Sequence, residues 1–463
     1  MSLGQFTFVP MNETCSHESG DTTNKADKAN DGIVHVTLEL EHSDWTVPGS
    51  EIFMSTFGSA LLEMIKAADR FVDFASYDTN HDGELSSDEA ALGFVIAGYE
   101  AAVTRDYSQY GADKYLWSHA FWLDELLKDK YPNASYYRPD GVLLSPYIAI
   151  SEQERTDMQS SIGTLAHELE HYLGLPDLYD VVYADDNPWS QYSTSFLCLM
   201  DAGSWGYTED GRSIPTALSA ACRYLLGWLD SIIVTYSESL LISPQDFSAP
   251  PNNSGYVVAK IPIDGRDDEF YLVENRRYSG WDEALKPYYG SSNPNGGLVF
   301  WHIDMSIFDK DPENVNGTDH HQAIMPLFIE KKANGDITFI GDSPNIKLAF
   351  FDAELWNSLY ASALGDYLVL PQYGTDPDND VPSARTLSQL KVSFAAAEGD
   401  SVLIRLADKP PDPATPTKGS PSEAKAALPA TGDPLQAGTF AALFGCSLAL
   451  LSICLLRRRF KSR

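Results

Sequence analysis

The first half of the chain carries apolar side chains at spacings typical of helices, with one segment typical of a strand. Residues 33–42 alternate between apolar and polar side chains, which predicts a strand. Residues 59–74 and 87–104 have apolar side chains at helical spacing, although the end of the first segment could also be a strand. Acids occupy the first turn of the second segment. Residues 214–229 predict a further helix, with Pro215 near its first turn.

Residues 157–173 predict another helix, with one apolar face. Gly174 follows at the position of a C-cap glycine, and Pro176 cannot continue a helix. The chain is therefore expected to turn immediately after this helix. The apolar face consists of Ile162, Leu165, Ala166, Leu169 and Leu173.

The character of the sequence changes after about residue 231. Short segments rich in β-branched and aromatic residues alternate with Gly, Pro, Asn and Asp, which predicts a β-rich, β-sandwich-like domain over residues 232–407. Residues 408–427 are rich in Pro and small residues and are predicted to be a linker that does not pack. Residues 1–31 are predicted to be disordered. Residues 32–231 form a mixed domain, so the fold class is α+β.

The net charge restricts the partners of this chain. It has 32 basic and 66 acidic residues among 463, a net charge of −34. This balance excludes nucleic acid as a partner, because phosphates need a basic face. It suits a soluble extracellular protein whose carboxylates bind divalent cations. A chain of this length is also expected to form two or three domains.

The five cysteines are too few for a disulfide scaffold in a chain of this length. Cys198 and Cys222 could pair if the compartment is oxidising. The alternative is two unpaired thiols in the core, which the sequence slightly favours.

The helix predicted before the turn contains His167-Glu168-x-x-His171. Histidines four residues apart on a helix point their rings the same way, so both can bind one metal ion. Zn²⁺ in a catalytic site needs a third protein ligand and one open position for water. The turn brings Asp177 within reach as that ligand, and Glu168 lies beside the histidines, where it can hold the metal-bound water.

The segment 197–207 follows in the sequence and is predicted to contain a methionine turn. Met200 would form an apolar floor under the metal. Tyr179 and Tyr207 are expected to be packing residues, which leaves the hydrogen-bond donor for the transition state unidentified. Asp180 is expected to be a solvated acid of the turn, the alternative being a ligand of a second cation.

These residues together resemble those of the M6 metalloproteases, the immune inhibitor A family. The residues that carry the likeness are His167, Glu168, His171, Gly174, Asp177 and Met200. The likeness extends to residues 115–123, 214–228 and 270–306, and it covers roughly residues 32–335.

The resemblance implies a zincin- or metzincin-like catalytic domain in which aspartate replaces the third metzincin histidine. Zn²⁺ would lower the pKa of its water and polarise the scissile carbonyl, while Glu168 takes the proton and passes it to the leaving amine. The implied activity is that of an extracellular zinc endopeptidase acting on proteins or peptides. The alternative is a surface-displayed binding protein or adhesin with a vestigial metalloprotease domain. The intact ligand set favours the peptidase.

Residues 78–89 match the pattern of an EF-hand calcium loop, in which Gly83 allows the sharp turn. The expected Ca²⁺ ligands are Asp78, Asn80, Asp82, Glu84 through its carbonyl, Ser86 and Glu89. M6 relatives that resemble this chain carry such an insertion in the catalytic domain, and its implied role is structural. The alternative is an acidic turn that binds nothing.

A second polar segment, residues 311–321, lies in the predicted β-rich domain. Candidate ligands are Asp311, Asn314 and Asn316 for a cation, and His302, His320 and His321 for a second zinc ion. The sequence favours a simpler interpretation, a polar β-connection with surface histidines.

Residues 428–463 resemble a Gram-positive sortase sorting signal. The pentapeptide Leu-Pro-Ala-Thr-Gly precedes an apolar run, residues 437–456, that is long enough to span a bilayer, and a basic segment follows. The resemblance implies that a sortase cuts between Thr431 and Gly432 and joins the chain to peptidoglycan. The alternative is a membrane anchor that is never cut.

Both alternatives place the protein outside a Gram-positive cell, attached to the cell wall or the membrane. The first residues of the sequence lack the charged start and long apolar run of a signal peptide. We therefore expect the native start to lie further upstream and to include an export signal.

Overall fold

The computed structural model describes most of the first half of the chain and shorter stretches of the second half. The described residues are 8–14, 28–103, 107–131, 135–155, 158–181, 194–229, 231–234, 239–244, 258–263, 267–291, 293–310, 314–317, 322–331, 337–340, 350–351, 368–372, 386–396 and 401–406. They form two compact units, divided between Gly174 and Leu175. We call residues 8–174 the N-terminal unit and residues 175–406 the C-terminal unit.

A five-stranded sheet forms the centre of the N-terminal unit. Its strands are β3 (Tyr115–Leu116), β2 (Gly93–Glu100), β6 (Tyr147–Arg155) and β4 (His119–Phe121), in that order, with β7 (Met158–Gln159) also paired to β6. Strand β2 is parallel to β3 and β6, whereas β4 and β7 are antiparallel to β6. A separate parallel pair joins β1 (Glu84–Leu85) to β5 (Leu143–Leu144).

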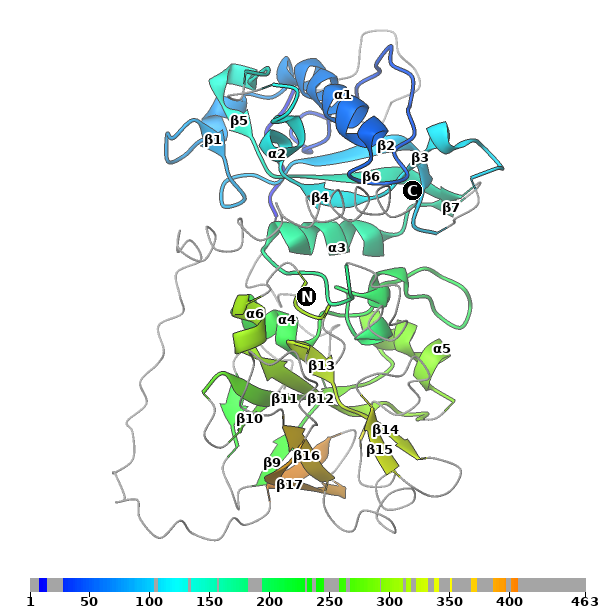
Figure 1. Cartoon of the computed structure of the whole chain (residues 1–463), viewed down its shortest axis with the longest axis vertical. Helices are drawn as coiled ribbons and strands as arrows, with labels where there is room; N and C mark the ends of the chain where they lie inside the picture. Colours follow the sequence, from blue (N-terminus) through cyan, green and yellow to red (C-terminus); the bar gives the residue numbers. More distant parts are fainter. Residues whose placement is uncertain are drawn as a thin grey trace, which may run out of the picture. The chain divides into compact units, whose positions relative to one another are not determined.

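Two helices cover this sheet, and Figure 1 shows them on its opposite faces. Helix α1 (Glu51–Asp69) begins at Ser50, whose side chain accepts a hydrogen bond from the amide of Phe53, and its apolar face packs into the core of the unit. Helix α3 (Ile162–Tyr172) packs on β4 and β6. The shorter helical segments are η1 (Phe74–Tyr77), η2 (Ala112–Lys114), α2 (Leu123–Leu127) and η4 (Pro139–Gly141).

Two predictions for this unit are wrong. Residues 33–42 contain no strand, because they pair with no neighbouring strand, and Ile33 is exposed. Residues 87–104 contain strand β2 and not a helix. Gly93 and Gly98 disfavour a helix there, and β2 gains hydrogen bonds along both edges from β3 and β6. Pairing with strands that are distant in the sequence therefore overrides the local apolar spacing.

The other predicted helices occur, with different ends. Helix α1 begins before the predicted segment 59–74 and ends inside it. Helix α3 lies within the predicted segment 157–173, and α4 (Ala220–Leu225) lies within the predicted segment 214–229. Ser219 determines the late start of α4, since its side chain accepts a hydrogen bond from the amide of Cys222 at 3.1 Å.

Part of residues 1–31, which are predicted to be disordered, forms hydrogen bonds within the N-terminal unit. The amide of Thr14 donates a hydrogen bond to the carbonyl of Phe71 at 2.8 Å. The side chain of Glu13 is buried and accepts a hydrogen bond from the amide of Asp31 at 2.9 Å. The charged and polar composition of this segment therefore does not prevent local packing.

Two sheets dominate the C-terminal unit. The first, in spatial order, consists of β13 (Ile324–Pro326), β12 (Gly297–Asp304), β11 (Glu269–Arg276), β10 (Val258–Pro262) and β8 (Ser231–Ile233). The second consists of β16 (Leu368–Gln372), β17 (Thr386–Ala396), β18 (Val402–Leu406) and β9 (Ser239–Ile242). A further antiparallel pair joins β14 (Phe328–Lys331) to β15 (Ile337–Ile340).

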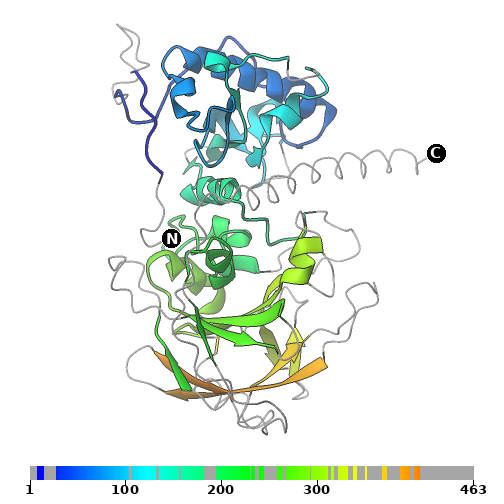
Figure 2. The same cartoon turned by 90° about the vertical axis from the view of Figure 1, so that its left-hand side faces the viewer.

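The two sheets share one hydrophobic core. Apolar side chains of β10, β11 and β12 pack with those of β9, β16, β17 and β18 in a single buried cluster. Figure 2 shows the sheets stacked, the first in light green and the second in orange. The helical segments of this unit are η6 (Ser195–Leu197), η7 (Ala202–Trp205), α4, η8 (Gly280–Leu285), α5 (Lys286–Tyr289) and α6 (Met305–Lys310).

The mixed α and β composition agrees with the predicted fold class, whereas other parts of that prediction are not tested. The zincin-like fold and the domain limits 32–231 and 232–407 stay predictions, and the compact units divide at a different place, after Gly174. Among the described residues, no helix has both the length and the apolar character to cross a membrane. The predicted linker 408–427, the segment 428–463 with Thr431 and Gly432, and the helix 437–456 lie outside the described residues.

Candidate metal centre

Helix α3 has a defined beginning and end. Ser161 is its N-cap, and its side chain accepts a hydrogen bond from the amide of Gly163 at 2.9 Å. At the other end, the amide of Gly174 donates to the carbonyl of His171 at 2.9 Å, and Gly174 has a φ of +94°. Glycine adopts this left-handed conformation without strain, so the chain leaves the helix where the sequence predicts.

The last turn of α3 is fixed to the N-terminal unit through Tyr172. Its hydroxyl donates to the carbonyl of Ala90 at 2.5 Å and lies 3.0 Å from the carbonyl of Pro146. Burial raises the pKa of Tyr172, so the side chain remains a neutral donor. Since His171 precedes Tyr172 directly, this anchor also determines the position of the histidine.

His167 and His171 present their Nε2 atoms to each other on one face of α3. The two nitrogens lie 3.2 Å apart, and the ring planes are at 88°. Only 7% of His167 and 9% of His171 is exposed. The helical spacing therefore gathers two imidazole nitrogens at one partly enclosed point, and their role as metal ligands stays a prediction.

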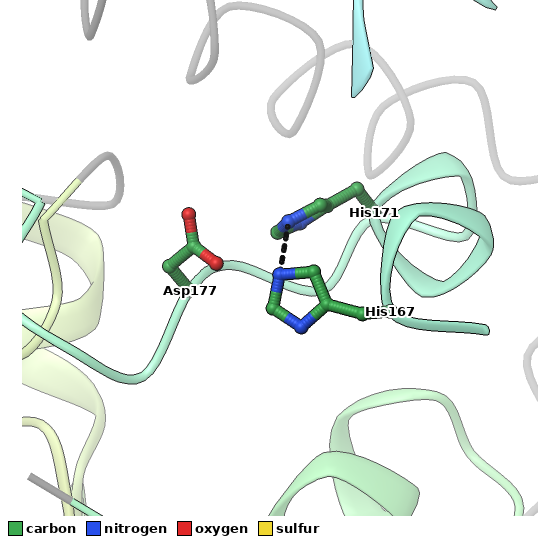
Figure 3. Close-up of side chains that lie close together, drawn as sticks. All are labelled: His167, His171 and Asp177. Carbon is green, nitrogen blue, oxygen red and sulfur yellow. Dashed lines mark hydrogen bonds between the residues drawn. The ribbon is translucent and has the colours of Figure 1, made fainter. Parts of the chain in front are cut away.

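Asp177 approaches the two histidines from the turn after the helix. One potential ligand atom from each of the three residues lies within 4.8 Å of the other two. Figure 3 shows the carboxylate pointing toward the imidazole rings. The neighbouring side chains of Leu175 and Leu178 are buried, which fixes the turn on either side of Asp177. Within the part of the chain that the structure describes, no other three His, Cys, Asp or Glu side chains converge in this way.

These three residues fit the coordination of a catalytic zinc ion. Zn²⁺ binds histidine nitrogen at about 2.0–2.1 Å in a tetrahedral arrangement, which separates two ligand atoms by about 3.3 Å. The separation of 3.2 Å between His167 and His171 agrees with this value. Two nitrogens and one carboxylate oxygen leave a fourth position open for water or substrate, which is typical of catalytic sites and not of structural ones.

The predicted methionine turn is a tight, buried turn in the C-terminal unit. The carbonyl of Cys198 accepts hydrogen bonds from the amides of Asp201 at 3.2 Å and Gly203 at 3.1 Å. The side chain of Met200 is fully buried, and its carbonyl accepts a hydrogen bond from the amide of Leu178 at 2.8 Å. The Met200 turn is therefore bonded directly to the residue after Asp177. Its role as an apolar floor stays a prediction.

Asp201 supports this turn with a buried carboxylate. It accepts hydrogen bonds from the amides of Thr194 and Ser195, each at 2.8 Å, and from its neighbour Ala202 at 2.7 Å. Burial raises the pKa of Asp201 well above its usual range, and the hydrogen bonds offset this only in part.

A buried ionic cluster, which no pattern in the sequence predicts, also contacts the turn. The guanidinium of Arg276 donates to the carboxylate of Asp282 and to the carbonyl of Leu197, and Arg223 donates to Glu274 at 2.6 Å. Burial disfavours the charged form of Arg276, but the carboxylates of Asp282 and Glu274 outweigh this effect and raise its pKa. The charged residues Glu274 and Arg276, which lie within the otherwise apolar segment 270–276, are the feature of the sequence that could have indicated this cluster.

The predicted calcium loop folds back on itself, because its side-chain oxygens accept hydrogen bonds from main-chain amides of the same loop. Asp78 accepts from the amides of Asp82 at 3.1 Å and Gly83 at 3.0 Å. Glu89 accepts from the amide of Asn80 at 3.1 Å, and Leu85 is buried. Slight burial raises the pKa of Glu89, but hydrogen bonds from Asn80, Thr79 and Ser86 outweigh it and lower the pKa. The carboxylates of this loop are not among the side chains that converge around one point.

Other candidate residues have different roles from those predicted. Asp180 is not a solvated acid: only 1% of it is exposed, and the side-chain amide of Asn314 donates to it at 3.1 Å. His302 is buried, with its Nε2 atom 2.8 Å from a carboxylate oxygen of Glu269. Tyr207, in contrast, packs edge-on against Tyr288 as predicted, although its side chain is exposed. Asp311, His320 and His321 lie outside the described residues.

The comparisons with known proteins bear on the first half of the chain. Residues 15–227 match the family model of the immune inhibitor A peptidase M6, catalytic domain. The comparison with curated proteins gives no match. The match ends at residue 227, so it covers less than the likeness over residues 32–335, but it includes all three candidate ligands and Met200. Residues 15–227 are therefore similar to the catalytic domain of the M6 peptidases, which supports a metallopeptidase of a family that typically depends on zinc.

Proposed function

We propose that this protein is a zinc endopeptidase that hydrolyses peptide bonds of protein substrates. The observation that carries the proposal is the convergence of His167, His171 and Asp177, whose ligand atoms lie within 4.8 Å of one another inside a peptidase M6 domain. These three residues would hold Zn²⁺. When bound, the ion supplies a Lewis acid that lowers the pKa of water and polarises the scissile carbonyl.

Glu168 is the residue that moves protons in this proposal. It follows His167 on α3, and 6% of it is exposed, so few water molecules compete for its carboxylate. Glu168 accepts a proton from the attacking water and gives it to the nitrogen of the leaving amine. The buried histidines and the carboxylate of Asp177 provide the ligands, and none of them needs to take a proton during the reaction.

The test compares two glutamates of the same helix. Glu168→Gln should keep about one zinc per chain and lower casein hydrolysis by about 10²–10⁴-fold, the usual contribution of a general base. Glu170→Gln is the matched control, because 8% of Glu170 is exposed and no part in hydrolysis is assigned to its side chain. Metal content is measured by atomic absorption, and activity with a quenched casein substrate.

The ligand variants complete this test. His171→Ala and Asp177→Ala should each lose zinc as well as activity. Full activity in Glu168→Gln would show that the general base lies elsewhere. A protein that binds zinc through these residues but cleaves no substrate would support the alternative, a surface-displayed binding protein with a vestigial peptidase domain.

We further propose that residues 78–89 bind Ca²⁺ and that the bound ion stabilises the N-terminal unit. The support is the order of oxygen ligands along the loop and the main-chain hydrogen bonds to Asp78, Asn80, Asp82 and Glu89. Such bonds bring the loop close to the conformation in which an EF-hand binds the ion.

We also propose that the protein is displayed outside a Gram-positive cell by a sortase. The support is confined to the sequence of residues 428–463, in which a Leu-Pro-Ala-Thr-Gly pentapeptide precedes an apolar run and a basic segment. The sortase would cut after Thr431 and transfer its carbonyl to an amine of peptidoglycan. The Pro-rich segment 408–427 would extend between the folded domains and the wall.

A further inference from the structure

We infer that Asn316, assisted by Asn314, positions the metal ligand Asp177 by holding the main chain that follows it. The inference rests on the proposed zinc site. Asn316 donates from Nδ2 to the carbonyl of Leu178 at 3.0 Å. Asn314 accepts from the amide of Val181 at 3.1 Å through its side-chain oxygen. The segment that the sequence suggests as a cation site is therefore bound to the turn after Asp177.

Leu178 is the residue through which this support reaches Asp177. Its amide donates to the carbonyl of Met200 at 2.8 Å, and its carbonyl accepts from Asn316. Its side chain is fully buried. Both main-chain groups of the residue next to Asp177 are thus bonded to other parts of the C-terminal unit. Rotation of the peptide that carries the ligand would break at least one of these bonds.

Asn316 is itself held rigidly. Its Nδ2 also donates to the carbonyl of Ile324 at 2.8 Å, and its Oδ1 accepts from the amide of Ile324 at 3.0 Å. The carboxamide therefore pairs with β13 in the way that one strand pairs with another, and it connects this sheet to the turn. The side chain of Asn316 is 0% exposed. A carboxylate at this position would lack both donors.

Asn314 supports the same turn further along the chain, at Asp180 and Val181. Its side-chain amide donates to the buried carboxylate of Asp180 at 3.1 Å, while its oxygen binds Val181. Gly317 is required for this arrangement, because a β-carbon at that position would overlap the carboxamide of Asn314. Leu178, Asp180 and Val181 are therefore all bonded to the short segment 314–317.

Asp177 needs such support because it lies outside the helix that carries the two histidines. The helical hydrogen bonds of α3 end at Gly174, so they do not hold the carboxylate. Residues that orient a metal ligand from outside the coordination sphere typically change metal affinity by about 10–100-fold when removed. We expect an effect of this size for Asn316, because it holds the peptide next to the ligand.

The experiment compares Asn316→Ala with Asn275→Ala. Asn275 is a matched control, since it is also 0% exposed, and its Nδ2 donates to the carbonyl of Ile242 at 2.9 Å, on strand β9. Both variants lose a buried carboxamide and should lower the melting temperature of the metal-free protein. Zinc affinity, measured by competition with a chromophoric chelator, should fall about 10–100-fold in Asn316→Ala and stay within about 3-fold of wild type in Asn275→Ala.

A second readout and a second variant keep the test decisive. Asn314→Ala should weaken zinc binding by less than Asn316→Ala, and Co²⁺ substituted into either variant should show an altered visible spectrum, which reports ligand geometry directly. Equal zinc affinities in wild type, Asn316→Ala and Asn314→Ala would overturn the inference. If Asn316→Ala does not fold, Asn314→Ala and Gly317→Ala decide the matter by the same measurement.

The outcomes distinguish this inference from the proposed function. Zinc binding that is absent in the wild type, or that survives Asp177→Ala, contradicts the proposed site itself. Zinc binding that depends on Asp177 but not on Asn316 or Asn314 contradicts the positioning role alone.

Discussion

Arg276 is a buried cation that links strand β11 to the start of the Met200 turn. Its guanidinium is bonded to Asp282 and to the carbonyl of Leu197, and Ala217 donates its amide to Asp282 at 3.1 Å. Removing one partner of a buried ion pair costs about 3–5 kcal/mol, because a charge is left without compensation. The cluster therefore holds three separate segments of the C-terminal unit in one arrangement.

Cys198 and Cys222 lie next to this cluster as a pair of buried thiols, with their sulfur atoms 3.6 Å apart. A disulfide requires an S–S distance of about 2.05 Å, so the two sulfur atoms have to approach each other by about 1.5 Å to form one. Burial raises the pKa of Cys198, but hydrogen bonds from Cys222 and Ser219 outweigh it and lower the pKa, which favours the reactive thiolate. The structure thus brings together the two cysteines that the sequence leaves as either paired or free.

We predict that protein refolded with oxidised glutathione forms a Cys198–Cys222 disulfide. The two thiols give up two protons and two electrons, and the glutathione disulfide is reduced to two thiols. Closing a loop of about 25 residues should stabilise the fold by about 3.5 kcal/mol. Peptide mapping without reductant detects the bond, and the urea midpoint with and without dithiothreitol measures its effect.

The control for this prediction is Cys222→Ser, whose urea midpoint should not depend on dithiothreitol. Two free thiols at positions 198 and 222 after oxidative refolding would contradict the prediction.

At the scale of elements, the calcium loop is connected to the core of the N-terminal unit by a very short strand. Strand β1 pairs with β5 through Glu84 and Leu85, and Leu85 is buried. An ion that binds the folded loop and not the unfolded chain stabilises the fold by mass action, by about 2.7 kcal/mol at 100 times the dissociation constant.

We predict that Ca²⁺ raises the melting temperature of the protein and that Glu89→Ala abolishes the rise. Asp88→Ala is the matched control, since it removes the same charge from the same loop at a position that supplies no expected ligand. Differential scanning calorimetry with Ca²⁺ and with a calcium chelator measures the rise. The same melting temperature in both solutions would sink the prediction.

The same prediction has a pH dependence with a definite sign. The pKa of Glu89 is lowered from 4.5, so its ionised form favours the folded loop. This contribution is present at neutral pH, above the ordinary value, and is lost as the pH falls through the lowered pKa. Protonation in acid also removes the carboxylate ligands that Ca²⁺ needs, so the calcium-dependent rise in melting temperature should disappear there, and Asp88→Ala should behave in the same way as the wild type.

At the scale of the whole molecule, the family match and the compact units do not coincide. The match to residues 15–227 extends across the division between Gly174 and Leu175, so the matched region includes part of each unit. Helix α3 ends at this division, and the candidate ligand Asp177 follows it by a few residues. The net charge of −34 belongs to the whole chain and is consistent with binding of cations and not of nucleic acid.

From the proposed sortase display, we predict that the protein is linked covalently to the cell wall of a Gram-positive host. Muralytic digestion of the wall should release it, and deletion of Thr431 should shift it to the membrane or the medium. Deletion of Thr417 is the matched control, because it removes the same residue type from the Pro-rich linker and should leave wall attachment unchanged. Immunoblots of the wall, membrane and medium fractions make the measurement. Full-length protein in the membrane, still carrying a tag placed after Arg463, would leave only a plain membrane anchor.

The sequence by itself determined the features that depend on short-range geometry. Two histidines four residues apart face the same way in any helix, and a C-cap glycine with a proline two residues later favours the end of that helix. His167, His171 and Gly174 therefore have the arrangement that their spacing predicts. The position of Asp177 near the histidines also depends on short-range geometry, because the turn that carries it follows directly after Gly174.

Only the tertiary structure decided the features that depend on partners far away in the chain. Residues 93–100 become a strand because β3 and β6 offer hydrogen bonds on both edges, and residues 33–42 do not, because they find no such partner. Asp180 is buried because Asn314 binds it from a segment that is distant in the sequence. Local periodicity cannot predict these pairings, since the free energy of a buried polar group is determined by whichever donor or acceptor the fold brings to it.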